Sequence, residues 1–134
     1  MKIVVLLIVA SLLAVSCNKS TVATPSFVTG NYAGTFEREK GIGKGPGAKV
    51  SLSFAVANFS GASDSTKYPA ICNGHFSITA DTINFQNQCV WTADFDWSLI
   101  LNGKYSFKAF GDSLEIKRVY PGQMTDVYRL KKVN

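Results

Sequence analysis

The residues best suited to catalysis or metal binding are few in this chain. It contains three cysteines, Cys17, Cys72 and Cys89, and one histidine, His75. Nucleophilic catalysis needs a cysteine or serine beside a base, and a zinc site needs three or four clustered ligands. His75 falls on the polar face of its strand, away from two cysteines that we expect to be bonded to each other. The sequence therefore predicts no catalytic residues, no metal site and no cofactor, and a protein that is not an enzyme.

Cys72 and Cys89 flank a stretch that can be paired as one β-hairpin around a turn at Ala80 and Asp81. In that register one face is apolar and the other is nearly all polar, as in a half-buried antiparallel pair. The cysteines face each other near the open end of the hairpin, within reach of a disulfide. The register predicts a Cys72–Cys89 bond and the pairs Thr79 with Thr82, Ile78 with Ile83, Phe76 with Phe85 and Ala70 with Trp91.

Two other stretches invite a chemical role and can be explained without one. Asp94 and Asp96 share a face, but it lies opposite the apolar face, so solvated carboxylates are expected in place of an acid–base pair. Residues 41–47 (GIGKGPG) lack the spacing of a phosphate-binding loop and join two strands. They form either a flexible hairpin loop or a mobile lid over one barrel mouth, made basic by Lys40 and Lys44.

Residues 1–16 have the pattern of a secretory signal peptide, with Lys2, an apolar run and small residues before Cys17. Residues 13–17 (LAVSC) resemble the lipobox of bacterial lipoproteins, in which the cysteine is acylated and becomes the mature N-terminus. The resemblance implies lipidation of Cys17, which leaves the other two cysteines as a pair. Asn18 implies sorting to the cell outer membrane, facing either the periplasm or the cell surface. The alternative is ordinary signal-peptide cleavage beside an incidental cysteine.

The rest of the chain divides into a short tether and one domain. Residues 17–29 comprise the lipidated cysteine and a flexible Ser/Thr-rich stretch, and residues 30–134 are long enough for a single core. Loss of Lys2 with the signal peptide leaves 13 basic against 9 acidic residues, so the net charge falls from +5 to +4. These charges are scattered, so a solvated surface explains them better than nucleic-acid binding does, and we expect a monomer.

Alternating apolar and polar residues fill the domain, and no window outside the signal peptide keeps a helical period. Residues 57–68 are expected to form a loop. A three-residue turn at 101–103, with Gly103 in a bulge, would set Leu99 beside Tyr105. Consecutive antiparallel strands remove their exposed edges by closing. The prediction is therefore an all-β, eight-stranded antiparallel up-and-down barrel with strands at 31–39, 49–56, 70–79, 82–91, 95–101, 104–110, 113–120 and 125–132.

In its strand order this barrel resembles the lipocalin-like (calycin) proteins, and more closely the small barrel lipoproteins of Gram-negative outer membranes. Gly30-Asn31-Tyr32 stands where that family has Gly-x-Trp in its first strand. Either Arg118 or Arg129 corresponds to the family's late-strand arginine. The resemblance extends from residue 30 to residue 132 and implies a lipid-anchored barrel that binds another molecule.

Arg118 and the inward aromatic residues are the candidates for ligand contact. Arg118 shares the face of the apolar core and needs a polar partner, with Tyr105 opposite it. This group is either a structural plug or the polar anchor of a pocket. We expect an envelope module that binds a small apolar or amphipathic molecule or a partner protein. The alternative is a filled barrel that binds a protein, such as a hydrolase, only through its loops. The candidate ligand-binding residues are Tyr32, Phe36, Trp97, Tyr105, Phe107, Arg118 and Tyr128.

Overall fold

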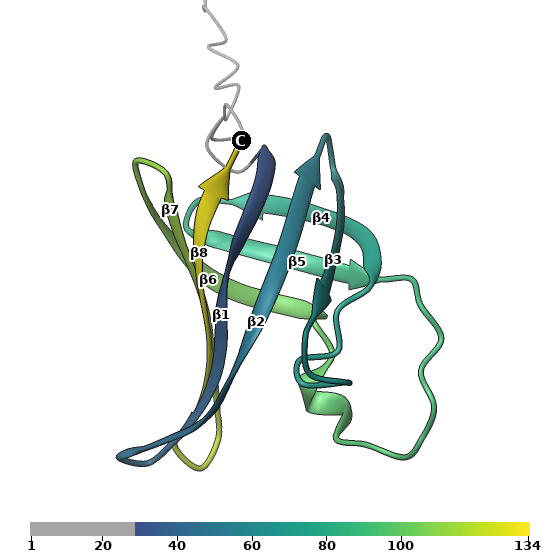
Figure 1. The fold of residues 1–134 in the computed structure, drawn as a ribbon, viewed down its shortest axis with the longest axis vertical. Helices are drawn as coiled ribbons and strands as arrows, with labels where there is room; N and C mark the ends of the chain where they lie inside the picture. The colour runs from purple at the N-terminus through teal and green to yellow at the C-terminus, as the bar shows by residue number, and fades with distance from the viewer. Residues whose placement is uncertain (1–28) are drawn as a thin grey trace, which may run out of the picture.

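The chain folds into a closed antiparallel barrel in which each strand pairs with the next and β8 returns to β1 (Figure 1). This computed structural model describes residues 29–134, so the signal peptide, Cys17 and almost all of the tether lie outside the described residues. The predicted eight-stranded up-and-down barrel is confirmed. Its strands are β1 (Gly30–Lys40), β2 (Gly43–Ala55), β3 (Asn58–Ser63), β4 (Asn73–Thr79), β5 (Thr82–Asn87), β6 (Gly103–Phe110), β7 (Ser113–Tyr120) and β8 (Met124–Val133).

The hairpin of β4 and β5 has the predicted register along its whole ladder, starting at the turn. Ala80 adopts the positive φ, 53°, that suits a two-residue hairpin turn. Side chains then alternate between the core and the outer face along both strands. The confirmed pairs are Thr79 with Thr82, Ile78 with Ile83 and Phe76 with Phe85.

Ala70 and Trp91 do not pair, contrary to prediction. The β4–β5 ladder ends before it reaches either residue. Ala70 instead forms a parallel bridge with Ile100. Its amide donates to the Leu99 carbonyl at 3.0 Å, and its carbonyl accepts from the Leu101 amide at 3.0 Å. Buried backbone N–H and C=O groups outside a ladder need other hydrogen-bond partners. Here residues 88–102, which we call the long loop, supply these partners.

The turns that join β6, β7 and β8 lie where the strand pattern predicted them. β6 and β7 are joined at residues 111–112, so Phe107 lies opposite Ile116. β8 pairs with β7 on one side and with β1 on the other. Tyr128 is the partner of Ile116 in the first ladder and of Phe36 in the second. This double pairing closes the barrel and brings side chains from the first and last strands together.

One strand was missed by sequence reasoning. Residues 57–68 were expected to form a loop, but Asn58–Ser63 forms β3 between β2 and β4. Its sequence, NFSGAS, contains a single large apolar residue, Phe59, which is buried. With small residues at the other inward positions, the strand shows no alternation of apolar and polar residues.

One predicted strand is absent. Residues 95–101 contain a short 3-10 helix, Trp97–Leu99, in place of a strand. Tyr105 consequently pairs with Ile83 of β5, and the proposed pairing of Tyr105 with Leu99 is wrong. Gly103 does have a positive φ, 87°, but it begins β6 after the long loop and does not close a hairpin. The gain of β3 offsets this loss, so the strand count of the prediction holds for a partly wrong reason.

The barrel interior is filled by side chains from all eight strands. The ring centroids of Phe36 and Tyr128 lie 4.8 Å apart, and those of Phe85 and Tyr105 lie 5.6 Å apart. Burying one such side chain contributes about 1.5–3 kcal/mol to the free energy of folding. The buried apolar cluster consists of Tyr32, Phe36, Val50, Leu52, Phe54, Phe59, Ile71, Ile83, Phe85, Leu101, Tyr105, Phe107, Leu114, Ile116, Tyr128 and Leu130.

Trp97, a candidate for ligand contact inside the barrel, lies outside it, and Val56, the last residue of the strand predicted at 49–56, lies beyond the observed strand. Trp97 is 57% exposed because its segment is not a strand of the barrel. Val56 is 88% exposed because β2 ends one residue earlier and the chain turns there.

The two ends of the barrel differ in which chain ends, turns and loops lie there (Figure 1). Asn31 of β1 pairs with Val133 of β8, so the described chain begins and finishes at one end, which we call the terminal end. The β1–β2 and β7–β8 turns and the long loop lie toward the opposite end, which we call the loop end. The charged side chains that face inward gather at the loop end.

Candidate functional site

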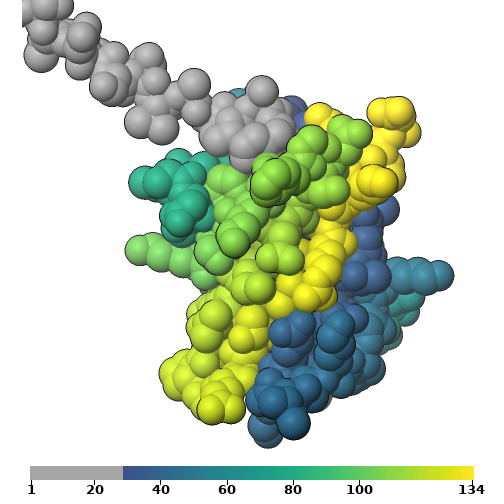
Figure 2. All heavy atoms as spheres, turned by 90° about the vertical axis from the view of Figure 1, so that its left-hand side faces the viewer, coloured from purple at the N-terminus to yellow at the C-terminus, as the bar shows by residue number. Residues whose placement is uncertain are grey.

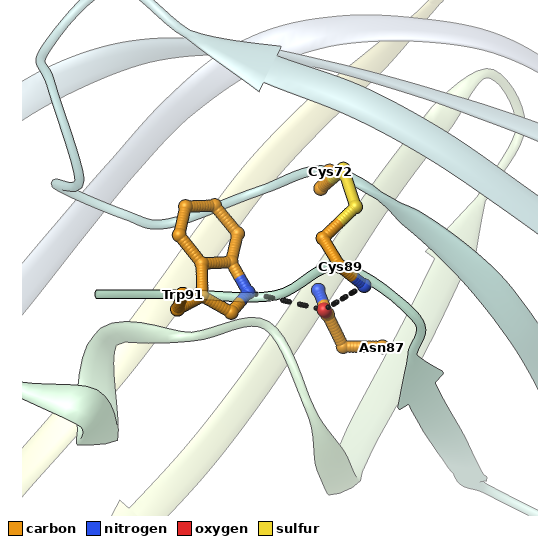
Figure 3. Close-up of a disulfide and its surroundings, with 4 residues drawn as sticks. All are labelled: Cys72, Asn87, Cys89 and Trp91. Carbon is orange, nitrogen blue, oxygen red and sulfur yellow. Dashed lines mark hydrogen bonds between the residues drawn. A yellow bond between two sulfur atoms is a disulfide. The ribbon is translucent and has the colours of Figure 1, made fainter. Parts of the chain in front are cut away.

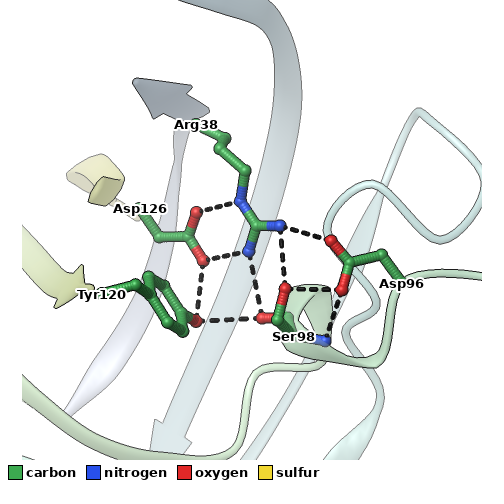
Figure 4. A network of polar contacts seen from close by, with 5 residues as sticks. All are labelled: Arg38, Asp96, Ser98, Tyr120 and Asp126. Atoms are coloured by element: carbon green, nitrogen blue, oxygen red, sulfur yellow. Dashed lines mark hydrogen bonds and ion pairs between the residues drawn. The ribbon is translucent and has the colours of Figure 1, made fainter. Parts of the chain in front are cut away.

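An arginine and an aspartate pair inside the loop end (Figure 4). Arg38 of β1 and Asp126 of β8 are opposite one another in the strand register. The guanidinium donates through Nε to Oδ1 at 2.6 Å and through Nη2 to Oδ2 at 2.8 Å, which is a two-point pairing. Asp126 is only 1% exposed. Burial by itself lowers the pKa of Arg38, but the hydrogen bond and charge of Asp126 raise it overall, so the guanidinium stays charged.

Tyr120 and Ser98 connect this pair to the long loop. The Tyr120 hydroxyl lies 3.1 Å from Asp126 Oδ2 and 2.9 Å from the Ser98 carbonyl oxygen, and its single proton is shared between these two acceptors. Arg38 donates through Nη1 to the Ser98 hydroxyl at 3.0 Å and through Nη2 to the Ser98 carbonyl at 3.1 Å. Burial is the main reason that the pKa of Tyr120 is raised well above its ordinary value, so its hydroxyl keeps its proton at neutral pH.

Asp96 completes the network from the loop side. Its Oδ2 accepts from Arg38 Nη1 at 2.8 Å. Its Oδ1 accepts from the Ser98 amide at 2.9 Å and from the Ser98 hydroxyl at 2.6 Å, which caps the 3-10 helix. The hydrogen bonds from Ser98, followed by the charge of Arg38, lower the pKa of Asp96. Asp96 was expected to be only a solvated carboxylate, but it attaches the loop to the barrel.

The predicted disulfide joins Cys72 to Cys89, with their Cα atoms 6.4 Å apart (Figure 3). It lies just beyond the β4–β5 ladder, where the long loop begins. Asn87 supports this corner, because its Oδ1 accepts from the Cys89 amide at 2.9 Å and from Trp91 Nε1 at 3.1 Å. Asn87 Nδ2 is buried without a hydrogen-bond partner among the described residues. The disulfide therefore fixes the first residues of the loop.

A further tie holds the middle of the long loop. Lys67 Nζ donates to Asp94 Oδ1 at 2.6 Å and to Thr92 Oγ1 at 2.8 Å, and it lies 5.0 Å from the centre of the Phe95 ring. The hydrogen bond from Lys67, followed by that from Thr92, lowers the pKa of Asp94 to about 2. The disulfide, Lys67 and Arg38 thus attach the loop at its start, middle and end.

Beside this network, Arg118 lines an open pocket of about 240 Å³ at the loop end, together with Trp97, Ser98, Ile100, Asn102 and Tyr120. The guanidinium carbon lies 4.7 Å from the centre of the Tyr120 ring and 5.5 Å from that of Tyr105. Nη1 donates to the Asn102 carbonyl at 2.7 Å. Among residues 29–134, no ion pair joins Arg118 to a carboxylate. The pocket thus offers one cation, with unused N–H donors, and the aromatic side chains of Trp97 and Tyr120.

The predicted candidate residues separate into two groups. Trp97 and Arg118 line the same pocket, and the predicted contact of Arg118 with Tyr105 is confirmed. The other group is buried in the core, where its members touch other side chains. That group consists of Tyr32, Phe36, Tyr105, Phe107 and Tyr128.

Sequence reasoning missed Arg38, Asp126 and Tyr120. The signal was present in the alternation, because Arg38 continues the inward face of Tyr32 and Phe36, and Asp126 continues that of Tyr128. Opposite charges on the inner faces of the first and last strands of a closed barrel are expected to pair. His75 is exposed, as expected, and its Nδ1 lies 2.7 Å from Asn58 Oδ1.

Residues 29–134 contain no group of three His, Cys, Asp or Glu side chains placed to hold a metal ion. Within the same range, no helix is long and apolar enough to cross a membrane. No protein-family model, curated protein or solved structure matches this chain. The loop end thus combines a loop held by the disulfide, Lys67 and Arg38 with a pocket lined by Trp97, Arg118 and Tyr120.

Proposed function

We propose that this protein is a lipid-anchored cell-envelope module that binds a partner protein through the pocket at its loop end. The observation that carries the proposal is the contrast between a filled barrel interior and an open, cationic pocket lined by Trp97, Arg118 and Tyr120. Of the two functions that the sequence left open, this is the filled barrel acting through its loops. The proposed role is binding, without catalysis.

The filled interior disfavours a ligand held inside the barrel. An eight-stranded barrel has room either for its own side chains or for one small ligand. Here Phe36, Phe85, Tyr105 and Tyr128 occupy the centre and are at most 2% exposed. A ligand of the usual lipocalin type would have to displace these rings, so a small apolar molecule is the less favoured candidate.

The composition of the pocket supports a protein partner. Trp, Tyr and Arg are the residue types most enriched among the few that dominate the energy of protein interfaces. A pocket of about 240 Å³ suits one or two side chains of a partner. Because Arg118 lacks a carboxylate partner among the described residues, it suits an acidic side chain or a C-terminal carboxylate. The three ties of the long loop limit the entropy lost on binding.

The location in this proposal comes from the N-terminal sequence. Cys17 follows a lipobox-like stretch and would carry the lipid, and Asn18 favours the outer membrane over the inner one. The described chain starts at the terminal end of the barrel, and the pocket lies at the opposite end. A lipid on Cys17 would therefore leave the pocket accessible, on either the periplasmic or the surface side.

Photocrosslinking tests the proposed binding surface. A photoreactive amino acid is placed at Trp97 in one variant and at His75, on the exposed outer face of β4, in another. We expect the probe at 97 to capture a defined envelope protein in living cells and the probe at 75 to capture none. The capture should be lost when Arg118→Gln is added. Equal capture from both positions, or capture at 97 that ignores Arg118→Gln, would contradict the proposal.

An apolar fluorescent dye tests the less favoured function. Dye uptake that is lost in Tyr105→Ala or Phe107→Ala, with the fold intact, would show a ligand cavity inside the barrel. We expect no saturable uptake, because these side chains are packed in the core.

A further inference from the structure

Three large apolar side chains are exposed around the terminal end of the barrel. Val56 is 88% exposed in the β2–β3 turn, Phe110 is 83% exposed at the end of β6, and Val133 is 45% exposed at the end of β8. We call these three residues the terminal rim. Figure 1 places all three strand ends at the same end of the barrel.

The strand registers place the rim around the point where the described chain begins. Gly30 pairs with Phe54, which lies two residues before Val56. Ser113, just after the β6–β7 turn, pairs with Lys131 near the end of β8. Figure 2 shows the β6–β7 hairpin and the end of β8 reaching the same upper edge of the molecule. The three residues thus lie around one end of the barrel, where a flat surface such as a bilayer can contact them at the same time.

We propose that the terminal rim docks onto an anionic lipid bilayer, with Phe110 and Val56 inserted at the level of the headgroups. This inference rests on the proposed lipid at Cys17. The segment between that cysteine and the barrel, residues 18–29, spans roughly 40 Å at full extension. The rim is therefore held close to the bilayer, and a contact that is weak by itself becomes populated through its high effective concentration.

The charges at this end fit a membrane better than they fit a hydrophobic protein partner. Lys108, Lys131 and Lys132 are exposed around the rim, while Asp81 and Asp112 in nearby turns and Glu115, opposite Lys108 in the β6–β7 ladder, offset that charge. Lysines near a bilayer surface are attracted to anionic headgroups, and apolar side chains beside them enter the interface. Because the carboxylates offset these lysines, the apolar side chains are the main source of docking, and the lysines add local contacts with anionic headgroups.

Docking at the rim fixes the orientation of the whole protein. The loop end, with the Arg118 pocket, then points away from the bilayer, toward a partner in the adjacent aqueous compartment. Without docking, the tether would allow the barrel to tumble and to turn its pocket toward the lipid.

The test compares two exposed apolar residues at opposite ends of the barrel. Phe110→Cys and Ile42→Cys are each labelled with an environment-sensitive fluorophore in the full lipidated protein. Ile42 is fully exposed in the β1–β2 turn at the loop end, so it serves as the matched control. With Cys72 and Cys89 bonded, and Cys17 acylated, the new thiol is the one that reacts. The protein is reconstituted into vesicles of phosphatidylethanolamine and phosphatidylglycerol that carry a quencher on their acyl chains.

We expect the fluorophore at 110 to be quenched about threefold more strongly than the one at 42, and Val56→Asp to abolish the difference. Equal quenching at both positions in protein that floats with the vesicles would overturn the docking alone. A blue-shifted but unquenched fluorophore at 110 would also overturn it and would point to a second protein copy on the rim. Protein that does not float with the vesicles would overturn the anchor, and the docking with it.

Discussion

Arg38 and Asp126 are 88 residues apart in the chain and form a two-point ion pair with N–O distances of 2.6 and 2.8 Å. The pair joins β1 to β8 at the seam where the barrel closes. The same guanidinium also binds Ser98 and Asp96 of the long loop. One side chain therefore contacts both the seam that closes the barrel and the long loop.

Removal of the buried carboxylate should destabilise the protein strongly. Asp126→Ala leaves the Arg38 guanidinium, whose side chain is 11% exposed, without its main partner. Breaking a buried pair from one side costs about 3–5 kcal/mol in the free energy of unfolding. Chemical denaturation measures this loss, and Asp81→Ala, at an exposed turn, is the control and should change stability by less than about 0.5 kcal/mol. Similar effects in the two variants would show that the pair does not support the fold.

The disulfide should stabilise the fold and restrict the long loop. It closes a loop with a sequence separation of 17 residues, for which the chain-entropy model gives about 3 kcal/mol. In Cys72→Ser/Cys89→Ser we expect a loss of up to that size in denaturation experiments. Amide hydrogen exchange should become faster at residues 88–94 while the β1–β8 ladder keeps its protection. Unchanged exchange in the loop would contradict the restricting role of the disulfide.

The Lys67 tie should be visible in the titration of Asp94, whose pKa of about 2 lies below the ordinary value of 3.8. A carboxylate with a lowered folded-state pKa contributes its stability above the ordinary value and loses it as the pH falls toward 2. Carboxyl-carbon NMR should show this midpoint in the wild type. In Lys67→Gln the midpoint should rise toward 3.8, whereas Lys104→Gln should leave it in place. A midpoint that ignores Lys67→Gln would contradict the tie.

Replacement by alanine should affect the stability of the fold very differently at two glycines. A Cβ on Gly34 would lie 1.9 Å from the Arg129 carbonyl oxygen across the β1–β8 seam, whereas a Cβ on Gly43 would lie 3.5 Å from its nearest neighbour. Gly34→Ala must therefore push the two backbones apart, at a cost of at least about 1–3 kcal/mol. Gly43→Ala should be nearly neutral. Thermal unfolding of both variants distinguishes them, and equal melting temperatures would contradict the tight seam.

Sequence patterns predicted the parts of the fold whose inner positions are large and apolar. The hairpin between the cysteines, the strands β6 and β7 and the disulfide all follow from alternation and spacing. β3 was missed because its inner positions, apart from Phe59, are small or polar. The apolar residues around Trp97 led to the opposite error, because they suggested a strand. Capping by Asp96 favours a 3-10 turn there.

Only part of the candidate site could be predicted, because its residues come from segments whose neighbours local sequence does not reveal. Arg118 was found because it continues an apolar face and needs a partner. Arg38 and Asp126 lie on inner faces by the same alternation, but each appears as a surface charge until the first and last strands are known to be neighbours. The position of Trp97 beside Arg118 depends on the path of the long loop, which local sequence does not encode.

We propose binding of a partner protein at the Arg118 pocket, outside a filled barrel. Its most direct test is the dissociation constant of the captured partner for wild type, Arg118→Gln and the exposed-strand control Lys104→Gln. A residue that dominates an interface contributes 2 kcal/mol or more, so we expect affinity to fall about 30-fold in Arg118→Gln and to stay within about twofold in Lys104→Gln. An unchanged dissociation constant in a folded Arg118→Gln protein would contradict the account.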